Sequence, residues 1–355
     1  MKMKEISIGS HKIGPEHPPY IVAEMSGNHM RSLKRALELV EAAKNSGVHA
    51  IKLQTYTPDT ITLDVKEGSF VIKDPKSLWN GRNLYDLYQE AHTPWEWHHE
   101  IFDRCRELDL TVFSTPFDET AVDFLESLHV PCYKIASLEI VDLPLIKKVA
   151  ATGKPVMIST GASTLVEIGE AVATARDGGC RDLMLLKCTF SQPALPIDTH
   201  LRTIPHLADC FDTLVGLSDH TLSLGVPIAS VALGCCLIEK HFTLSREEGG
   251  VDTAFSLEPQ EFEMLVKGTY DAWQALGRIQ YAPLPAEKSL LRIRPSLYFV
   301  EDLPAGTIVQ ANHMRSVRPG DGLPPKELER VIGLTIRASV KKGTPVSWDL
   351  FKDKK

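Results

Sequence analysis

The sequence has no excess of positive charge and no long hydrophobic run. Its 355 residues carry a net charge of −7, and lysine and arginine form no cluster along the chain. A nucleic acid is therefore not an expected partner, although a few well-placed lysines could still hold a small anion. No stretch approaches the roughly 18–20 apolar residues that a membrane-spanning helix requires, and we expect no membrane contact.

The sequence also lacks the marks of a secreted protein. Residues 1–14 contain no apolar core of signal-peptide length. The seven cysteines are irregularly spaced and several lie inside apolar runs, which is typical of buried reduced thiols rather than of a disulfide framework. These absences predict a cytoplasmic protein. The chain is long enough for one large domain and a small one.

What the sequence does contain is a repeat of short apolar runs. Eight of them occur in the first 255 residues, and each ends in polar residues. A parallel strand that is covered on both faces reads as a continuous apolar run. The polar residues would then stand at the carboxyl ends of strands, where barrel enzymes carry their active sites. The runs are 20–23, 50–53, 110–113, 132–135, 155–158, 183–186, 214–217 and 235–238.

Amphipathic stretches separate these runs. The segment 32–46, for example, places Leu33 and Leu37 on one helical face. Strand and helix alternate about eight times, which matches a (β/α)8 (TIM) barrel in length and order. A doubly wound sheet is the alternative, but it would need a glycine-rich first turn, and residues 24–28 are not G-x-G-x-x-G. Further helices are predicted at 94–108, 118–128, 143–151, 164–177, 222–233 and 259–276.

The pattern changes after residue 276. Residues 277–290 have no strong period and predict a linker. Residues 291–355 are rich in valine, isoleucine, glycine and proline, which predicts a small mostly-β domain. The barrel should therefore occupy 1–276. About 60 residues form only a marginal core, so docking onto another surface, such as the barrel mouth of a partner subunit, would stabilise the small domain.

Two histidines are the sharpest candidates for chemistry. His220 and His241 follow the seventh and eighth apolar runs, which would be neighbours in a barrel. Imidazoles from adjacent strand ends can share one divalent metal ion. Oxygen ligands would accompany them, and this ligand set does not choose among Mn²⁺, Mg²⁺, Co²⁺ and Zn²⁺. The alternative is that they are two unrelated polar residues at strand ends.

Lysines and serines at other strand ends suggest a site for an anion. Lys52 and Lys134 lie within or just after apolar runs, where an unpaired lysine is costly. As ammonium groups they could hold a phosphate or carboxylate; alternatively, one of them could form a Schiff base. Ser137, Ser159 and Ser218 would add hydroxyl donors, although each serine alone could be a helix N-cap.

Carboxylates also mark the expected mouth of the barrel. Glu24 ends the first run and Asp252 follows the last; each could act as a base, accept a hydrogen bond or be a solvated loop acid. Glu239 and Lys240 are expected to pair with each other or with neighbouring strand ends. A polar excursion at 57–88 interrupts the repeat, and we expect it to lie over the catalytic face.

Several segments resemble one known family in order along the chain: IVAEMSGNH, IKLQTY, FSTPFD, YKIAS, ISTGAS, LSDHT, EKHFT, GGVDTAFSLEP and VRPGDG. The resemblance is to the sialic-acid synthases, which condense phosphoenolpyruvate with an amino-sugar aldehyde to make nine-carbon keto sugar acids. It implies a (β/α)8 barrel followed by a small antifreeze-like (SAF) domain. It also implies a homodimer in which that domain reaches over the barrel of the partner subunit.

One branch of the family is the most similar. The stretch NLYDLYQEAHTPWEWH resembles the pseudaminic acid synthases, whose acceptor is 2,4-diacetamido-2,4,6-trideoxy-β-L-altropyranose. The neuraminate and legionaminate branches resemble it less in this stretch. Neuraminate synthases usually carry C-T-x-x-Y-P after the sixth strand, whereas Gln192 stands at the tyrosine position here.

The resemblance also implies roles for individual residues. His220 and His241 would bind the divalent metal ion (Mn²⁺, Mg²⁺ or Co²⁺), and Glu24 would serve in acid–base work or orient the reacting groups. Asp252 and Arg318, the latter from the partner subunit, would hold the sugar. A noncatalytic sugar-binding protein is the remaining alternative, and the density of lysine, histidine and serine at strand ends argues against it. Phosphoenolpyruvate would be surrounded by Lys52, Gln54, Thr115, Lys134, Ser137, Ser159 and Ser218.

Overall fold

Within residues 5–352, which the computed structural model describes, eight parallel strands close into a barrel. The strands follow one another in chain order, and β10 closes the barrel against β3. This arrangement confirms the predicted (β/α)8 barrel and excludes the doubly wound sheet, in which the strand order would reverse. The strands are β3 Tyr20–Glu24, β4 Ala50–Thr55, β5 Thr111–Pro116, β6 Tyr133–Ile135, β7 Val156–Ser159, β8 Leu183–Cys188, β9 Leu214–Asp219 and β10 Leu237–His241.

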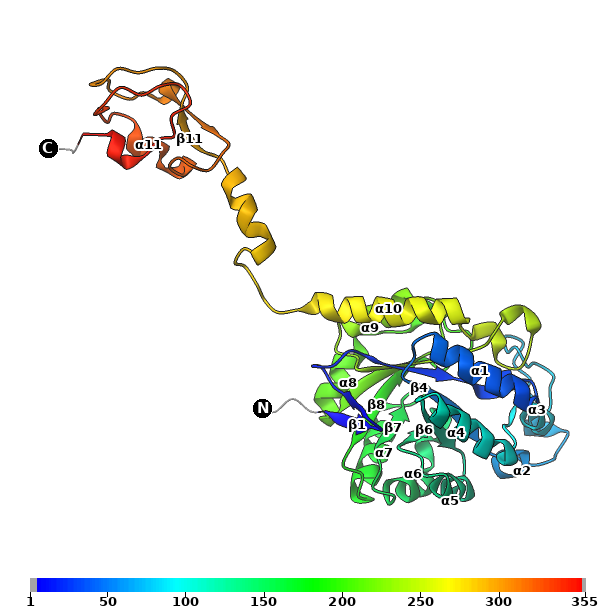
Figure 1. Ribbon diagram of the computed structural model, residues 1–355. Helices are drawn as coiled ribbons and strands as arrows, with labels where there is room; N and C mark the ends of the chain where they lie inside the picture. Colours follow the sequence, from blue (N-terminus) through cyan, green and yellow to red (C-terminus); the bar gives the residue numbers. More distant parts are fainter. Residues whose placement is uncertain (1–4, 353–355) are drawn as a thin grey trace. The chain divides into compact units, whose positions relative to one another are not determined.

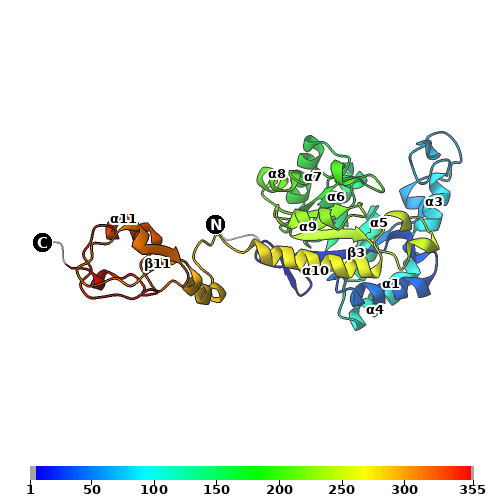
Figure 2. The ribbon, with the colours of Figure 1, turned by 90° about the horizontal axis from the view of Figure 1, so that it is seen from above.

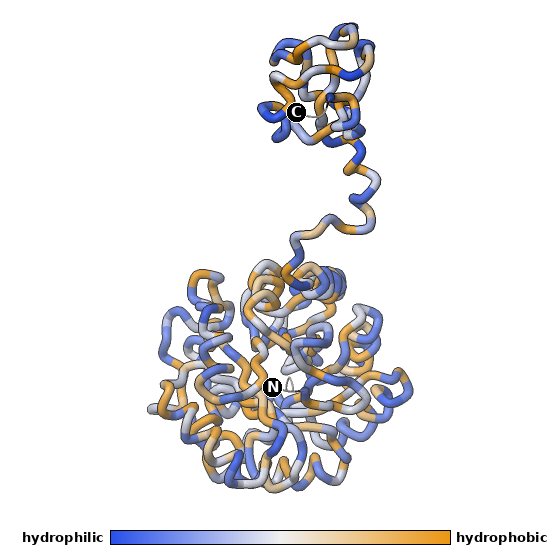
Figure 3. The backbone as a smooth tube through the Cα atoms, turned by 90° about the vertical axis from the view of Figure 1, so that its left-hand side faces the viewer, coloured by the Kyte–Doolittle hydropathy of each residue, from blue (hydrophilic) through white to orange (hydrophobic). Residues whose placement is uncertain are grey.

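Helices cover the outside of the barrel (Figure 1). Hydrophobic and hydrophilic residues are mixed along the tube of this unit (Figure 3), as expected for helices with one face against the strands. No helix in the described range combines the length and hydropathy that a bilayer span requires. The helices of this unit are α1 Leu33–Asn45, α2 Pro58–Ile61, α3 Leu84–Ala91, α4 His98–Glu107, α5 Glu119–Ser127, α6 Leu143–Ala150, α7 Leu165–Asp177, α8 Thr203–Phe211, α9 Gly225–Val231 and α10 Pro259–Leu276.

Several helices differ from the sequence-based expectation, since α2 and α3 form in and beside the excursion at 57–88, where none was predicted. The helix predicted at 94–108 is divided into a 3₁₀ turn, Trp95–Trp97, and α4. Helix α8 was not predicted, because it contains Pro205 and buries only Ile204 and Leu207. Two buried positions make too weak an apolar period to indicate a helix.

The amino-terminal half of the barrel interior is filled by apolar side chains. Phe113, Met184 and Leu186 belong to this inner cluster. The hairpin of β1 Ile6–Ile8 and β2 His11–Ile13 adds its three isoleucines to the same cluster. Figures 1 and 2 show this dark-blue hairpin at the opposite end of the barrel from α3. Open space is therefore left at the carboxyl ends of the strands.

The excursion after β4 is built from short pieces that are tied together. It contains α2, a 3₁₀ turn at Gly68–Phe70 and α3. Asn83 caps α3, because its side-chain oxygen accepts from the backbone N–H of Tyr85 at 2.9 Å. The indole Nε1 of Trp79 donates to the carbonyl of Val251 at 3.1 Å. This last bond attaches the excursion to the loop that follows β10.

The second unit spans Arg278–Lys355, and the first Met1–Gly277. Strands β11 Ser296–Phe299 and β12 Met314–Val317 pair antiparallel around a small core that also includes Val331 of α11 Leu328–Val331. This confirms a small mostly-β domain. A 3₁₀ helix at Pro285–Ile293 overlaps the end of the segment 277–290, which was expected to be a linker.

Candidate active site

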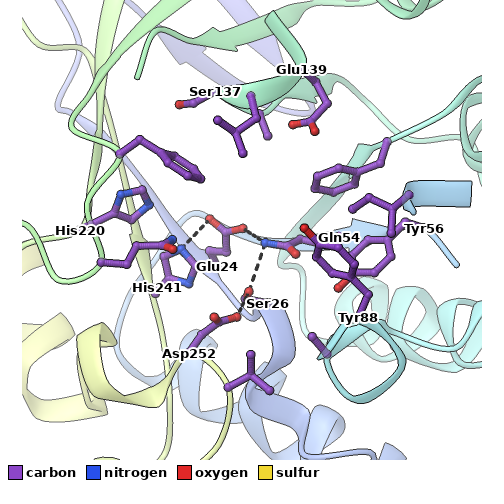
Figure 4. A pocket seen from close by; sticks show the side chains of 18 of the residues that line it. Glu24, Ser26, Gln54, Tyr56, Tyr88, Ser137, Glu139, His220, His241 and Asp252 are labelled. Carbon is purple, nitrogen blue, oxygen red and sulfur yellow. Dashed lines mark hydrogen bonds and ion pairs between the residues drawn. The ribbon is translucent and has the colours of Figure 1, made fainter. Parts of the chain in front are cut away.

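A cavity of about 520 Å³ lies at the carboxyl ends of the barrel strands. Strand ends form its floor, and the excursion after β4, including α3, and the loop after β10 form its sides (Figure 4). All but two of the predicted site residues line this cavity: Glu24, Lys52, Gln54, Lys134, Ser137, Ser159, Ser218, His220, His241 and Asp252.

Four buried charges form a network on the floor. The ammonium of Lys134 lies 2.6 Å from Oε1 of Glu239, and that of Lys52 lies 3.3 Å from the same oxygen. Lys52 also lies 3.0 Å from Oε1 of Glu24. All four side chains are at most 5% exposed. Because two positive and two negative charges compensate each other, none is buried alone, which would be costly.

Strand alternation explains why these residues meet. Successive side chains on a strand point to opposite faces. Val22 faces the inside of the barrel, so Glu24, two residues later, faces inward as well, and the same alternation directs Glu239 and His241 of β10 inward. The strand register places Glu24 beside Lys52 on one side and beside His241 on the other.

The two lysines differ in their electrostatic surroundings. Burial by itself lowers the pKa of an ammonium. For Lys52 the attraction of Glu239 and Glu24 outweighs burial and raises the pKa above its usual value. For Lys134 burial prevails over the attraction of Glu239, repulsion from Lys52 adds to it, and the pKa is lowered. The pKa of both carboxyl groups is lowered, because the lysines outweigh the opposing effect of burial.

A chain of hydrogen bonds runs from Glu24 to the mouth of the cavity (Figure 4). The amide of Gln54 donates to Oε1 of Glu24 at 2.7 Å and to the hydroxyl of Ser26 at 3.1 Å. Ser26 in turn donates to Oδ2 of Asp252, which also accepts from the backbone N–H of Gly27 at 3.2 Å. Asp252 and Glu24 are therefore held by one network, although they come from opposite ends of the barrel sequence.

The two predicted histidines lie side by side at the edge of the charge network (Figure 4). The ring centroids of His220 and His241 are 5.2 Å apart. Nδ1 of His220 lies 3.0 Å from the carbonyl oxygen of Thr189; since a carbonyl only accepts, Nδ1 carries a proton, and in the neutral ring Nε2 keeps its lone pair. Nε2 of His241 lies 3.5 Å from Glu24, and its buried Nδ1 has no hydrogen-bond partner among the described residues.

These imidazoles fit a divalent metal ion. A buried ring nitrogen without a partner is uncommon in folded proteins, and Nδ1 of His241 is such an atom. Imidazole nitrogens are good ligands for Mn²⁺, Co²⁺ and Zn²⁺. Within residues 5–352 no group of three or more histidine, cysteine or acidic side chains could hold a metal ion by itself. Further ligands would therefore come from substrate or water.

The three predicted serines reach the cavity through different contacts. The hydroxyl of Ser218 donates to Oε1 of Glu239 at 3.0 Å. Ser137 accepts from the backbone N–H of Gly161 at 3.1 Å, and its side chain makes no N-cap bond to the turn that follows it. The buried hydroxyl of Ser159 has no partner in the described part of the chain. Ser159 therefore has an unused hydrogen-bonding group at the floor.

Two predicted residues do not line the cavity. The hydroxyl of Thr115 accepts from the ammonium of Lys52 at 3.3 Å, so it helps to orient that lysine. Arg318 belongs to the second unit, where its side chain is exposed in the turn before Pro319. Its contact with a sugar bound to a partner subunit stays a prediction.

The sequence analysis missed an aromatic wall and one carboxyl group. Tyr56, Tyr88 and Phe117 line one side of the cavity, and the ring of Tyr56 makes edge-on contacts with Tyr88 at 5.7 Å and Phe117 at 5.1 Å. Figure 4 places Glu139 near Ser137 and away from the imidazoles. Burial raises the pKa of Glu139 to about 7. Glu139 stands only two residues after Ser137 in the sequence, and this position could have identified it as a candidate site residue.

Comparisons with known proteins place the chain in a family. A model of the NeuB family matches residues 39–281, and a model of the SAF domain matches residues 294–352. The chain belongs to the NeuB family. Over 334 residues it is 41% identical to a protein from Helicobacter pylori that is named pseudaminic acid synthase. The matched stretch covers 94% of this chain and 97% of that protein.

Two further relatives of this NeuB chain come from other branches. It is 34% identical over 337 residues to an N,N'-diacetyllegionaminic acid synthase from Legionella pneumophila, covering 93% of this chain and 94% of that protein. A solved N-acetylneuraminic acid synthetase from Leptospira borgpetersenii, in complex with citrate, is 29% identical with a TM-score of 0.72 and covers 81% of this chain and 95% of its own. These relatives confirm the family resemblance drawn from the motifs.

Replacement of Glu239 by glutamine should destabilise the barrel by about 3–5 kcal/mol, because two buried ammonium groups would then face a single carboxylate. The double variant E239Q/K134M also removes one ammonium group. Its free energy of unfolding should therefore exceed that of E239Q by at least about 1 kcal/mol. Urea unfolding followed by far-ultraviolet circular dichroism measures both. S218A, which removes only a neutral donor to the same carboxylate, is the matched control. Wild-type stability in E239Q would contradict the network.

Glu139 should make stability depend on pH. Its folded pKa of about 7 lies above its usual 4.5, so the folded state binds this proton more tightly than the unfolded state. Stability is therefore lost as pH rises from about 4.5 to about 7. Relative to E139Q, the wild type should lose about 3 kcal/mol of unfolding free energy across this window. A difference that stays constant with pH would refute this assignment.

Proposed function

We propose that this NeuB-family chain condenses phosphoenolpyruvate with 2,4-diacetamido-2,4,6-trideoxy-β-L-altropyranose and water to give pseudaminate and phosphate. One observation carries the proposal. Two ammonium groups and two imidazoles converge on one cavity, in a chain that is 41% identical to a protein named pseudaminic acid synthase. An anionic donor and a carbonyl acceptor are the reactants that such a set of groups would bring together.

The floor of the cavity suits the anionic donor. Lys52 and Lys134 supply positive charge, and the hydroxyl of Ser159 has no other partner in the described residues. Phosphate and carboxylate oxygens offer many acceptor lone pairs to such donors. Because Glu239 already holds both ammonium groups, their positions are set before the donor arrives. Phosphoenolpyruvate would thus be oriented without reorganising the floor.

The reaction balances with one molecule of water. The π electrons of the donor form a bond from its C3 to the aldehyde carbon, and water adds at the electron-poor C2. The C2–O bond to phosphate then breaks, and the leaving phosphate takes the electron pair. One proton of the water goes to the new carbinol oxygen and the other to phosphate. Glu24, which contacts Gln54 and His241, is placed to orient the water and to hold one of these protons in transit.

A divalent cation (Mn²⁺, Mg²⁺ or Co²⁺) held by His220 and His241 would supply Lewis-acid polarisation of the aldehyde oxygen. The chain's own part is to hold the two imidazoles close together. Burial opposes charge on His220, but its contacts with Cys188 and with the carbonyl of Thr189 outweigh burial and raise its pKa, so this ring would have to lose a proton when a cation binds. Burial lowers the pKa of His241, and repulsion from His220 adds to that effect.

The sides of the cavity suit a sugar with apolar substituents. Tyr56, Tyr88 and Phe117 form an aromatic wall, against which a 6-deoxy methyl group and acetamido methyl groups could pack. Asp252 and Gln192 line the same cavity and offer polar contacts. N-acetylmannosamine or the legionaminate precursor is the alternative acceptor, and either would keep the donor site unchanged.

We further propose a homodimer in which Arg318 of one chain closes the site of its partner. Large apolar side chains are exposed on the loops that follow strands β6 to β8, and they would be covered by such a partner. The chain would work in the cytoplasm. The exposed residues of these loops and of the start of α7 are Leu138, Val141, Leu165, Val166, Leu195 and Ile197.

A Schiff-base aldolase is the competing mechanism, and the lowered pKa of Lys134 is the observation that favours it. The 2.6 Å contact with Glu239 opposes it, because an ion pair keeps the ammonium protonated. The two mechanisms differ in what a chelator does: it removes the activity of a metal-dependent synthase and leaves that of a Schiff-base enzyme intact.

Phosphate release should be measured with each of the three aldehydes, with and without added metal. We expect a kcat/KM at least about ten-fold higher for the trideoxy-altrose sugar than for N-acetylmannosamine. Chelation should abolish turnover, and Mn²⁺ should restore it. Turnover with N-acetylmannosamine alone would overturn the acceptor. Full activity in chelator, with borohydride trapping substrate on Lys134, would overturn the mechanism.

Complementation tests the partner's arginine. R318A and H241A should each be inactive as homodimers while keeping the wild-type fold. A heterodimer of the two, isolated with two different tags, contains one complete site if Arg318 acts on the partner's barrel. Its activity should therefore be about half that of the wild type. An inactive heterodimer would show that Arg318 does not act across subunits.

A further inference from the structure

A second buried ion pair lies on the strands that position the histidines. The ammonium of Lys240 donates to Oδ2 of Asp219 at 2.7 Å, and both side chains are 1% exposed. The sequence left open whether Lys240 pairs with Glu239 or with a neighbouring strand end. In the structure it pairs with Asp219, at the end of the neighbouring strand β9. Glu239 faces the cavity, so the residue after it faces away. Neither Asp219 nor Lys240 lines the cavity.

This pair holds the backbone on both sides of His220. Oδ1 of Asp219 accepts from the backbone N–H of Thr221 at 2.9 Å, and Oδ2 accepts from its hydroxyl at 3.1 Å. Lys240 donates to the carbonyl oxygen of Thr221. Three groups of the residue after His220 are thus tied to the ion pair, and Lys240 itself immediately precedes His241.

The same pair also fixes the two strand ends relative to each other. Asp219 of β9 and Lys240 of β10 are direct neighbours in the parallel register. A buried ion pair is seldom a better stabiliser than apolar side chains of similar size. Its specific property is direction: charged hydrogen bonds fix atoms at defined positions, which apolar packing does less strictly.

We infer that Asp219 and Lys240 are positioning residues that hold the imidazoles of His220 and His241 in the arrangement that a shared divalent ion requires. The inference rests on the metal role given to the two histidines in the proposed function. Groups that orient metal ligands typically change metal affinity 10- to 100-fold when they are removed. The phosphoenolpyruvate site should be less affected, because its lysines lie on the inner face and have other partners.

The test is Mn²⁺ binding to the substrate-free protein, followed by the electron paramagnetic resonance signal of free Mn²⁺. The double variant D219N/K240M removes both charges together, so no buried charge is left unpaired. Its dissociation constant for Mn²⁺ should rise about ten-fold or more. The KM for phosphoenolpyruvate should stay within about two-fold of the wild type, which separates loss of positioning from general damage to the site.

A matched control removes an ion pair at the opposite end of the barrel. Lys154, just before β7, donates to Glu126 at 2.5 Å, and K154M should leave Mn²⁺ affinity unchanged. If the double variant does not fold, T221V replaces it. That variant keeps both charges, the side-chain shape and the backbone bond to Asp219 but loses the hydroxyl bond, and the dissociation constant should rise roughly two- to ten-fold.

The outcomes separate two failures. A wild-type protein that binds no Mn²⁺ would overturn the metal role in the proposed function, and this inference with it. Wild-type binding together with unchanged affinity in a folded D219N/K240M, or in a folded T221V, would overturn the positioning role alone. A rise confined to the variants of this ion pair, and absent in K154M, is the result that supports it.

Discussion

The mutual compensation of four buried charges is the constraint on which the rest of the structure depends. Glu24, Lys52, Lys134 and Glu239 lie at most 5% exposed on the floor of one cavity. Any one of them alone would be too costly to bury. Together they keep two ammonium groups charged where water is largely excluded, and there an ammonium attracts an anion more strongly than it does in water.

That compensation requires the barrel. The four charges come from β3, β4, β6 and β10, which are brought together only when the strands close in register. Apolar side chains fill the barrel at the amino-terminal ends of its strands, so open space remains only at the carboxyl ends. The outer pair Asp219–Lys240 and the inner pair Lys134–Glu239 share strand β10, where Glu239 and Lys240 point to opposite faces. Stability and chemistry thus depend on the same strand ends.

Much of this arrangement could be predicted from the sequence, because strand ends are visible as apolar runs with polar termini. His220, His241 and Lys52 were found in that way. For Glu239 and Lys240 the sequence left open a pair with each other or with neighbouring strand ends. Strand alternation, however, sends adjacent residues to opposite faces, and the two charges find different partners.

Residues outside the strands were harder to predict. Tyr88 and Glu139 reach the cavity from α3 and from the 3₁₀ turn after β6, and the placement of such segments depends on packing that has no sequence period. Thr115 was predicted to help surround the donor; it does not line the cavity, and its hydroxyl accepts from Lys52. The role of Arg318 depends on a second copy of the chain, which no single-chain pattern can establish.

The most direct test of the central claim is a crystal structure of the protein with phosphoenolpyruvate and Mn²⁺. The account predicts that oxygen atoms of the donor lie within hydrogen-bond distance of the ammonium groups of both Lys52 and Lys134, with Glu239 still paired to them. A donor bound elsewhere in the cavity, or a covalent imine on Lys134, would contradict it.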